Sequence, residues 1–150
     1  MSTIVIAGAA GRIGNAAARA FVDAGWRVRG IARGEKLKQL PDGVEPVEAD
    51  AFDRKAMTNA CAGADVILHA LNPTYDKWTT HVMPMAENVL AAAKAAGATV
   101  MIPGNVYNYG TSIGVDMAED APMAPDTEKG RLRVDLEDMF EAASENGVQT

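Results

Sequence analysis

Short apolar segments alternate with segments of helical spacing along the 150-residue chain. Each apolar segment has the length and the aliphatic composition of one buried strand, and the segments between them place apolar residues three or four positions apart. Strands that alternate with helices form right-handed βαβ units, in which the strands are parallel and helices cover the sheet. The pattern therefore predicts an α/β protein whose doubly wound parallel sheet has helices on both faces.

Turn and cap residues separate the predicted elements. Pro46 indicates that the third strand lies at an edge, because proline cannot donate a hydrogen bond to a ladder. Gly25 closes the first helix, and Asp53 can cap the second. The strands are expected at Thr3–Ala7, Trp26–Ala32, Val44–Ala49, Ala64–Leu71 and Ala98–Pro103. The helices are expected from Ile13 to Ala24, from Asp53 to about Ala62, from Trp78 to Ala96, and after Asp126.

The charge balance and the single cysteine restrict the class of protein. The 20 acidic and 14 basic side chains give a formal net charge of -6, which opposes binding to nucleic acid or to an anionic membrane. Cys61 has no intrachain disulfide partner, so a reducing compartment is expected. No apolar stretch approaches the roughly 20 residues that span a bilayer. We expect a cytoplasmic protein with no nucleic-acid or membrane partner.

Three glycines stand between the first strand and the first helix, at Gly8, Gly11 and Gly14. In this context the first glycine permits a tight turn, the second lets the backbone approach a pyrophosphate, and the third lets the helix pack closely on the strand. The helix N-terminus supplies N–H groups and a partial positive charge for phosphates. Glycines that serve packing alone are the alternative, but the strand–turn–helix context favours a Rossmann-type dinucleotide site.

The residues after the second strand bear on which dinucleotide binds. Sites for NAD place an acid about 20 residues beyond the glycines, on the ribose 2′-hydroxyl. Here that position reads Ile31-Ala32-Arg33-Gly34 and has no acid. Arg33 and Arg12 offer cations suited to the 2′-phosphate of NADP. We therefore expect NADP, with NAD the weaker candidate. The alternative is that both arginines are solvated surface residues that bind no phosphate.

The chain resembles the short-chain dehydrogenase/reductase superfamily, in its extended branch of epimerases and dehydratases. The resemblance is carried by Gly8 to Gly14, Asp50, Asp65 to Ala70, and Val106-Tyr107. It implies that Asp50 contacts the adenine amino group and that Ala70, Leu71 and Asn72 line the nicotinamide ribose. The expected cofactor-binding residues are Gly8, Ala10, Gly11, Arg12, Ile13, Gly14, Arg33, Asp50, Ala51, Ala70, Leu71, Asn72, Pro103 and Arg131.

The family's length bears on domain organisation. Its members commonly run to about twice this length and carry a small C-terminal substrate domain, and the final residues Gly147 to Thr150 read as the start of a sixth strand. We therefore expect residues 1–150 to be a dinucleotide-binding domain that lacks the C-terminal substrate domain and is cut within or before the sixth strand.

The usual catalytic residues of this superfamily are missing from the pattern. The resemblance implies a Tyr-x-x-x-Lys pair and a Ser or Thr after the fifth strand, but Thr127 and Arg131 stand at the pair and Pro103 at the hydroxyl position. Threonine has no accessible ionisation and arginine cannot shuttle protons. The expected catalytic candidates are Tyr107, Asn105 and His81, with Tyr109 also near the ligand edge. Packing of the two tyrosines in a loop remains an equal alternative.

Two classes of function follow from these residues. The first is an NADP-dependent oxidoreductase or epimerase that acts on a small carbonyl or sugar-like substrate with an atypical acid–base set. The second is a non-catalytic module of the same fold that senses NADP(H). No cluster has metal-ligand spacing, so no metal is expected. His69 is expected to be a hydrogen-bonded core histidine and Cys61 a small buried hydrophobe. Whether the chain forms a homodimer stays open.

Overall fold

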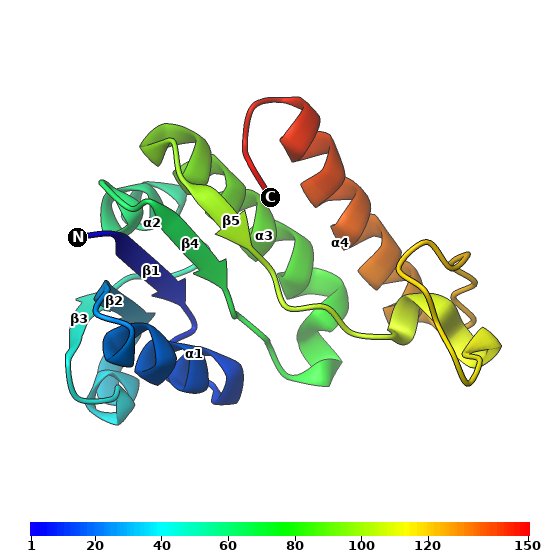
Figure 1. The fold of residues 1–150 in the computed structure, drawn as a ribbon, viewed down its shortest axis with the longest axis horizontal. Coiled ribbons are helices and arrows are strands. Elements are labelled where there is room, and N and C mark those ends of the chain that lie inside the picture. The colour runs from blue at the N-terminus through cyan, green and yellow to red at the C-terminus, as the bar shows by residue number, and fades with distance from the viewer.

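The computed structural model describes residues 1–150 and confirms the predicted sheet. Five parallel strands lie in the order β3-β2-β1-β4-β5 (Figure 1). β3 is an edge strand, as Pro46 predicted. β1 is central, and Ile4 to Ala7 are completely buried within it. The strands are β1 (Thr3–Ala7), β2 (Arg27–Ala32), β3 (Val44–Glu48), β4 (Val66–His69) and β5 (Thr99–Met101).

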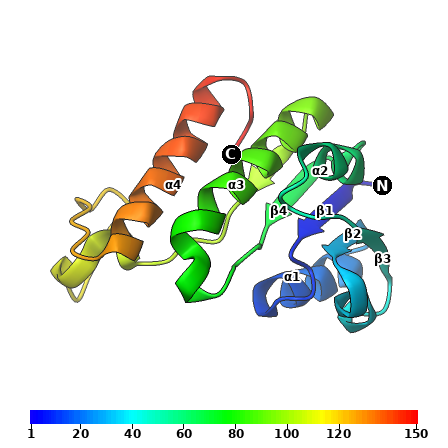
Figure 2. The same ribbon diagram turned by 180° about the vertical axis from the view of Figure 1, so that it is seen from behind.

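Helices cover both faces of the sheet, also as predicted (Figures 1 and 2). α1 packs over Ile4, Ile6 and Val28 on one face. The other three helices share a larger core with the opposite face, which includes Val5 and Ile67. The α-helices are α1 (Arg12–Asp23), α2 (Arg54–Cys61), α3 (Trp78–Ala96) and α4 (Glu128–Glu145). The 3-10 helices are η1 (Gly34–Gln39), η2 (Tyr75–Lys77) and η3 (Tyr107–Ser112). None of the helices is both long and apolar enough to cross a membrane.

Two strands end earlier than their apolar sequence predicts. β4 ends at His69 rather than Leu71, and β5 ends at Met101 rather than Pro103. His69 pairs with Ala7, the last residue of β1, so the chain beyond it has no ladder partner on that side. The residues that follow β4 and β5 are thereby released from the sheet and form walls at its carboxyl edge.

The last residues of the chain run beside β5. The Val100 N–H donates to the Gln149 carbonyl at 2.8 Å, and the Thr99 hydroxyl lies 3.1 Å from the Gln149 side-chain oxygen. Val148 is buried in the core between the sheet and α4. These residues form no strand of their own in the structure.

Candidate cofactor and substrate site

The turn between β1 and α1 leaves no room for side chains at two of its glycines. Gly8 has a φ of +89°, and a Cβ there would lie 2.6 Å from the carbonyl oxygen of Ala70. A Cβ at Gly14 would overlap the Gly8 carbonyl oxygen. Both contacts are with backbone, which cannot move aside as a flexible side chain can. The predicted roles of these two glycines in the turn and in helix packing are therefore confirmed.

The N-terminus of α1 presents unpaired backbone donors beside this turn. Gly11 is the N-cap in extended conformation, and no side chain caps the helix. The first N–H groups of a helix have no acceptor within the helix. Arg12 and Ile13, in the first turn, border a cleft along the carboxyl edge of the sheet. The turn therefore offers fixed donors and the positive end of the helix dipole to an anion.

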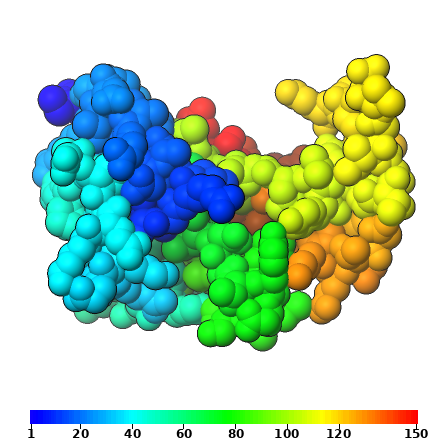
Figure 3. Space-filling model, turned by 90° about the horizontal axis from the view of Figure 1, so that it is seen from below, coloured from blue at the N-terminus to red at the C-terminus, as the bar shows by residue number.

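The cleft has a volume of about 1340 Å³ and brings together most of the predicted cofactor residues. Figure 3 shows this edge of the molecule, where α1 (blue), the start of α3 (green) and the segment after η3 (yellow) surround a hollow. The predicted residues that line the cleft are Gly8, Ala10, Gly11, Arg12, Ile13, Arg33, Asp50, Ala51, Ala70, Leu71, Asn72 and His81. Lys36 also lines it, a cation in η1 that the sequence interpretation missed.

Arg33 and Asp50 are bonded to each other at one end of the cleft. An Arg33 guanidinium nitrogen lies 2.9 Å from one Asp50 carboxylate oxygen, and both side chains are about half exposed. The other Asp50 oxygen accepts the Phe52 N–H at 3.0 Å. The sequence interpretation treated the two residues as separate contacts to the 2′-phosphate and to adenine. The structure shows that they form one ion pair at the rim.

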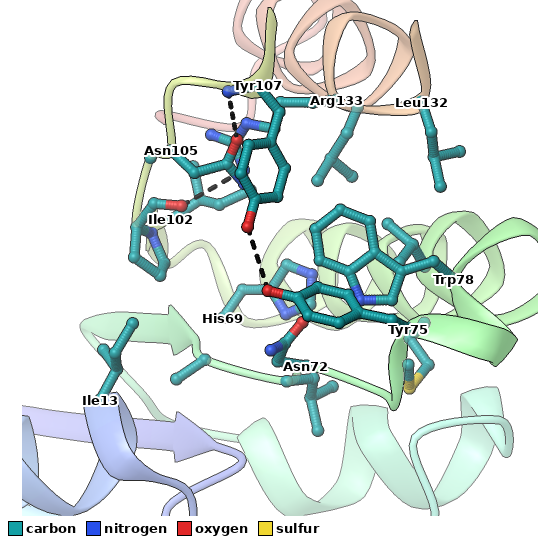
Figure 4. Close-up of a pocket in the computed structure, with 17 residues that line it drawn as sticks. Ile13, His69, Asn72, Tyr75, Trp78, Ile102, Asn105, Tyr107, Leu132 and Arg133 are labelled. Atoms are coloured by element: carbon teal, nitrogen blue, oxygen red, sulfur yellow. Dashed lines mark hydrogen bonds between the residues drawn. The ribbon is translucent and has the colours of Figure 1, made fainter. Parts of the chain in front are cut away.

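A smaller cavity of about 220 Å³ adjoins the cleft (Figure 4). Ile13, Ala70, Leu71 and Asn72 line both spaces, so the cavity opens where the nicotinamide end of a dinucleotide is expected. Three predicted residues line the smaller cavity but not the cleft, namely Pro103, Asn105 and Tyr107. Tyr75 and Trp78 face them from η2 and the start of α3. The structure therefore places two of the catalytic candidates, Tyr107 and Asn105, on the wall of one cavity.

Tyr107 is held at the mouth of this cavity by contacts on both sides. Its hydroxyl lies 3.0 Å from the Tyr75 hydroxyl, and its N–H donates to the Asn105 side-chain oxygen at 3.0 Å. Its ring centroid lies 5.9 Å from that of Trp78. The hydrogen bond to Tyr75 raises the pKa of Tyr107 above its usual value. The Tyr107 hydroxyl is therefore protonated at neutral pH, and it is a weaker acid than the hydroxyl of a free tyrosine.

His81 lies apart from these two candidates. It lines the large cleft, where its ring meets the edge of Phe52 at 4.8 Å between centroids. Its Nδ1 is 2.8 Å from the hydroxyl of Thr80. Neither His81 nor Tyr109 borders the smaller cavity. The three predicted catalytic residues therefore do not form one cluster, and only Tyr107 and Asn105 share a site.

The start of α4 corrects the position of the expected cation. Thr127 is the N-cap, and its hydroxyl accepts the Gly130 N–H at 3.0 Å. Arg131 is exposed and borders neither space, whereas Arg133 is 6% exposed and lines the smaller cavity. Two residues along a helix turn the side chain by about 200°, so only one of these arginines can face the cavity. Arg133, and not the predicted Arg131, therefore lines the smaller cavity.

His69 differs from the expected core histidine in one respect. It is 5% exposed and stacks near Phe140, but its Nδ1 has no hydrogen-bond partner within the chain. Burial, and to a smaller extent the charge of Arg133, lower the pKa of His69 to about 4. The ring is therefore neutral at physiological pH. Cys61 is buried as expected, and burial raises its pKa to about 11.

Comparisons with known proteins bear on the class of cofactor. Residues 8–145 match the family described as NAD(P)H-binding. The 2-alkyl-3-oxoalkanoate reductase of Shewanella oneidensis is 30% identical over 100 residues, which cover 63% of this chain and 26% of the reductase.

Solved structures show the same fold at low sequence identity. A short-chain dehydrogenase/reductase superfamily protein of Agrobacterium tumefaciens with bound NAD superposes with a TM-score of 0.76 at 22% identity, over 98% of this chain and 46% of that one. The UDP-N-acetylglucosamine 4-epimerase of Bacillus cereus gives 0.82 at 15% identity, over 99% and 53%. The chain thus spans about half the length of these structures. The fold predicted from the resemblance is confirmed.

Proposed function

The chain belongs to the NAD(P)H-binding family, and from that premise we propose that it is an NADP(H)-dependent reductase of small carbonyl compounds. The observation that carries the proposal is the Tyr107 hydroxyl at the mouth of a cavity that opens onto the dinucleotide cleft. The name of the Shewanella relative, a reductase of 3-oxoalkanoates, supports reduction over epimerisation.

The residues present fit a dinucleotide. A Cβ at Gly8 or Gly14 would fill the backbone cradle, and the first N–H groups of α1 have no acceptor of their own. These donors suit a pyrophosphate, and Ala70, Leu71 and Asn72 would line the nicotinamide end. Arg33, Arg12 and Lys36 supply three cations around the far end of the cleft. This charge supports NADP(H) over NAD(H).

The proposed chemistry needs one proton donor beside the carbonyl. A reduced nicotinamide, when bound in the cleft, would supply the hydride that the carbonyl carbon needs. Tyr107 donates its proton to the carbonyl oxygen and is reprotonated from solvent, which balances the reduction to an alcohol. Asn105 uses its side-chain oxygen to hold the Tyr107 backbone, which leaves its amide nitrogen free to donate to the same carbonyl.

The test of this proposal is consumption of NADPH by the full-length protein with a panel of aldehydes, ketones and oxo acids. Turnover with any of them supports a reductase. Tight NADPH binding without turnover across the panel would instead favour the NADP(H)-sensing module.

We expect Arg33→Ala to weaken NADPH binding at least tenfold and to leave NADH nearly unchanged. A charged hydrogen bond to phosphate contributes about 1.5–3 kcal/mol, which NADH cannot form. Titration calorimetry with both cofactors measures the difference. Arg27→Ala is the matched control, because Arg27 is an equally exposed arginine of β2 that pairs with Glu45 at 2.8 Å and does not border the cleft. Equal losses for both cofactors in Arg33→Ala would contradict the assignment.

Asp50→Ala should weaken both cofactors by a similar factor of roughly three to thirty. The reason is the loss of one exposed hydrogen bond to adenine together with the Phe52 N–H contact that shapes the loop. The same titrations measure this effect. A loss confined to NADPH would show that Asp50 acts only by orienting Arg33, and the adenine contact would have to be abandoned.

A further inference from the structure

We propose that the smaller cavity binds the carboxylate of a short oxo acid, with Arg133 as the anion-binding residue. This inference rests on the proposed function, because it names the substrate class for the same site. It is carried by Arg133, a buried cation that lines the cavity and whose guanidinium donors are only partly used by the chain.

Arg133 is a buried cation with unused donors. Its Nε donates to a Glu137 carboxylate oxygen at 2.6 Å, and one terminal nitrogen donates to the Pro103 carbonyl at 3.2 Å. A guanidinium has five N–H donors, so these two bonds leave three. The second terminal nitrogen lies beside Gly104, which also borders the cavity. An anion in the cavity could accept charged hydrogen bonds from these remaining donors.

His69 reaches the same cavity from a different element. Its ring lies at the end of β4, it borders the cavity, and its Nδ1 has no partner. A neutral imidazole offers one donor and one acceptor. The Nδ1 atom itself is fully buried, so His69 contributes the neutral ring beside Arg133 and not an exposed donor or acceptor for a ligand.

The size and remaining lining of the cavity restrict this ligand. Its volume of about 220 Å³ lies below the roughly 300–1,000 Å³ of typical ligand pockets. Trp78, Leu132 and Leu136 make much of the wall apolar. Arg133 and Tyr107 approach the cavity from the same side (Figure 4). A short oxo acid fits this arrangement, with its carboxylate on Arg133 and its carbonyl at the Tyr107 hydroxyl.

The test compares acetoacetate with acetoacetamide, which has the same number of heavy atoms but no charge. Calorimetry with the full chain saturated with NADP⁺ measures binding of each probe without turnover. We expect acetoacetate to bind at least tenfold more tightly than the amide, as charged hydrogen bonds require. Arg133→Met should remove this preference and Arg133→Lys should keep part of it. Arg27→Met should keep all of it, because Arg27 also pairs with a carboxylate but lies outside both spaces.

Several results would overturn the inference. Equal binding of the two probes to the wild-type chain would do so even if Arg133→Met failed to fold, and so would no binding of either. An Arg133→Met protein that loses NADP⁺ but keeps the preference for acetoacetate would assign Arg133 to the cofactor instead. A chain that binds no NADP(H) contradicts the proposed function alone, because the ratio of the two probes measured without cofactor still decides this inference.

Discussion

Tyr107→Phe is expected to lower turnover of a carbonyl substrate by a factor of 10² to 10⁴ while NADPH affinity stays within about twofold. The loss follows from removal of a positioned general acid. Cofactor affinity is preserved because Tyr107 borders only the smaller cavity. Steady-state kinetics and NADPH titration of the same preparation measure the two effects.

Tyr109→Phe is the control for this change. Tyr109 belongs to the same 3-10 helix, η3, but borders neither the cleft nor the cavity, so its variant should keep wild-type turnover. Normal turnover in Tyr107→Phe would exclude Tyr107 as the proton donor. A large loss in both variants would show that the integrity of η3, rather than the Tyr107 hydroxyl, is what turnover requires.

Gly8→Ala is expected to lower the free energy of unfolding by about 3 kcal/mol or more and to abolish detectable NADPH binding. The positive φ alone costs about 1–2 kcal/mol for a residue with a Cβ. The remainder arises because the new methyl would lie 2.6 Å from the Ala70 carbonyl oxygen and must push apart the ends of β1 and β4. Urea unfolding and NADPH titration test the two expectations.

Gly25→Ala is the control that separates the backbone strain of a positive φ from the steric overlap expected in Gly8→Ala. Gly25 has a similar φ of +78°, but no atom lies within 4 Å of the position of its added Cβ. It should therefore lose only about 1–2 kcal/mol and bind NADPH normally. If the two variants were destabilised equally, the contact between Gly8 and Ala70 would not be the reason why the turn requires glycine.

The sequence predicts the fold well because short-range residue patterns identify each helix and strand. The apolar run of β1, the edge position of Pro46 and the cap at Asp53 are all found where their local chemistry predicts. The ends of β4 and β5 are less predictable. They depend on where the neighbouring strand stops, and His69 ends β4 because its partner Ala7 ends β1.

The candidate site is predictable only in part, for a related reason. Gly8 and Arg33 lie at positions fixed by the strand–turn–helix order. The pairing of Arg33 with Asp50 joins residues from two different strand ends, so no local pattern encodes it. The sequence interpretation missed Arg133 because its position on the cavity wall depends on which face of α4 meets the cavity. Its spacing of four from Glu137 was the available signal, since such a pair commonly lies along one helix face.

A ligand that enters the smaller cavity must compete with the Tyr75 hydroxyl for its hydrogen bond to Tyr107. When Tyr107 is the donor in this bond, the Tyr75 hydroxyl occupies the place on Tyr107 that the proposed substrate oxygen would take. A ligand that enters must replace a contact with a net value of about 0.5–1.5 kcal/mol, and only a molecule with its own acceptor at that point recovers the loss. A hydrocarbon of the same shape would be disfavoured by about two- to tenfold. A proposed substrate must therefore form a hydrogen bond with Tyr107 that is at least as strong as the bond that Tyr75 forms with it.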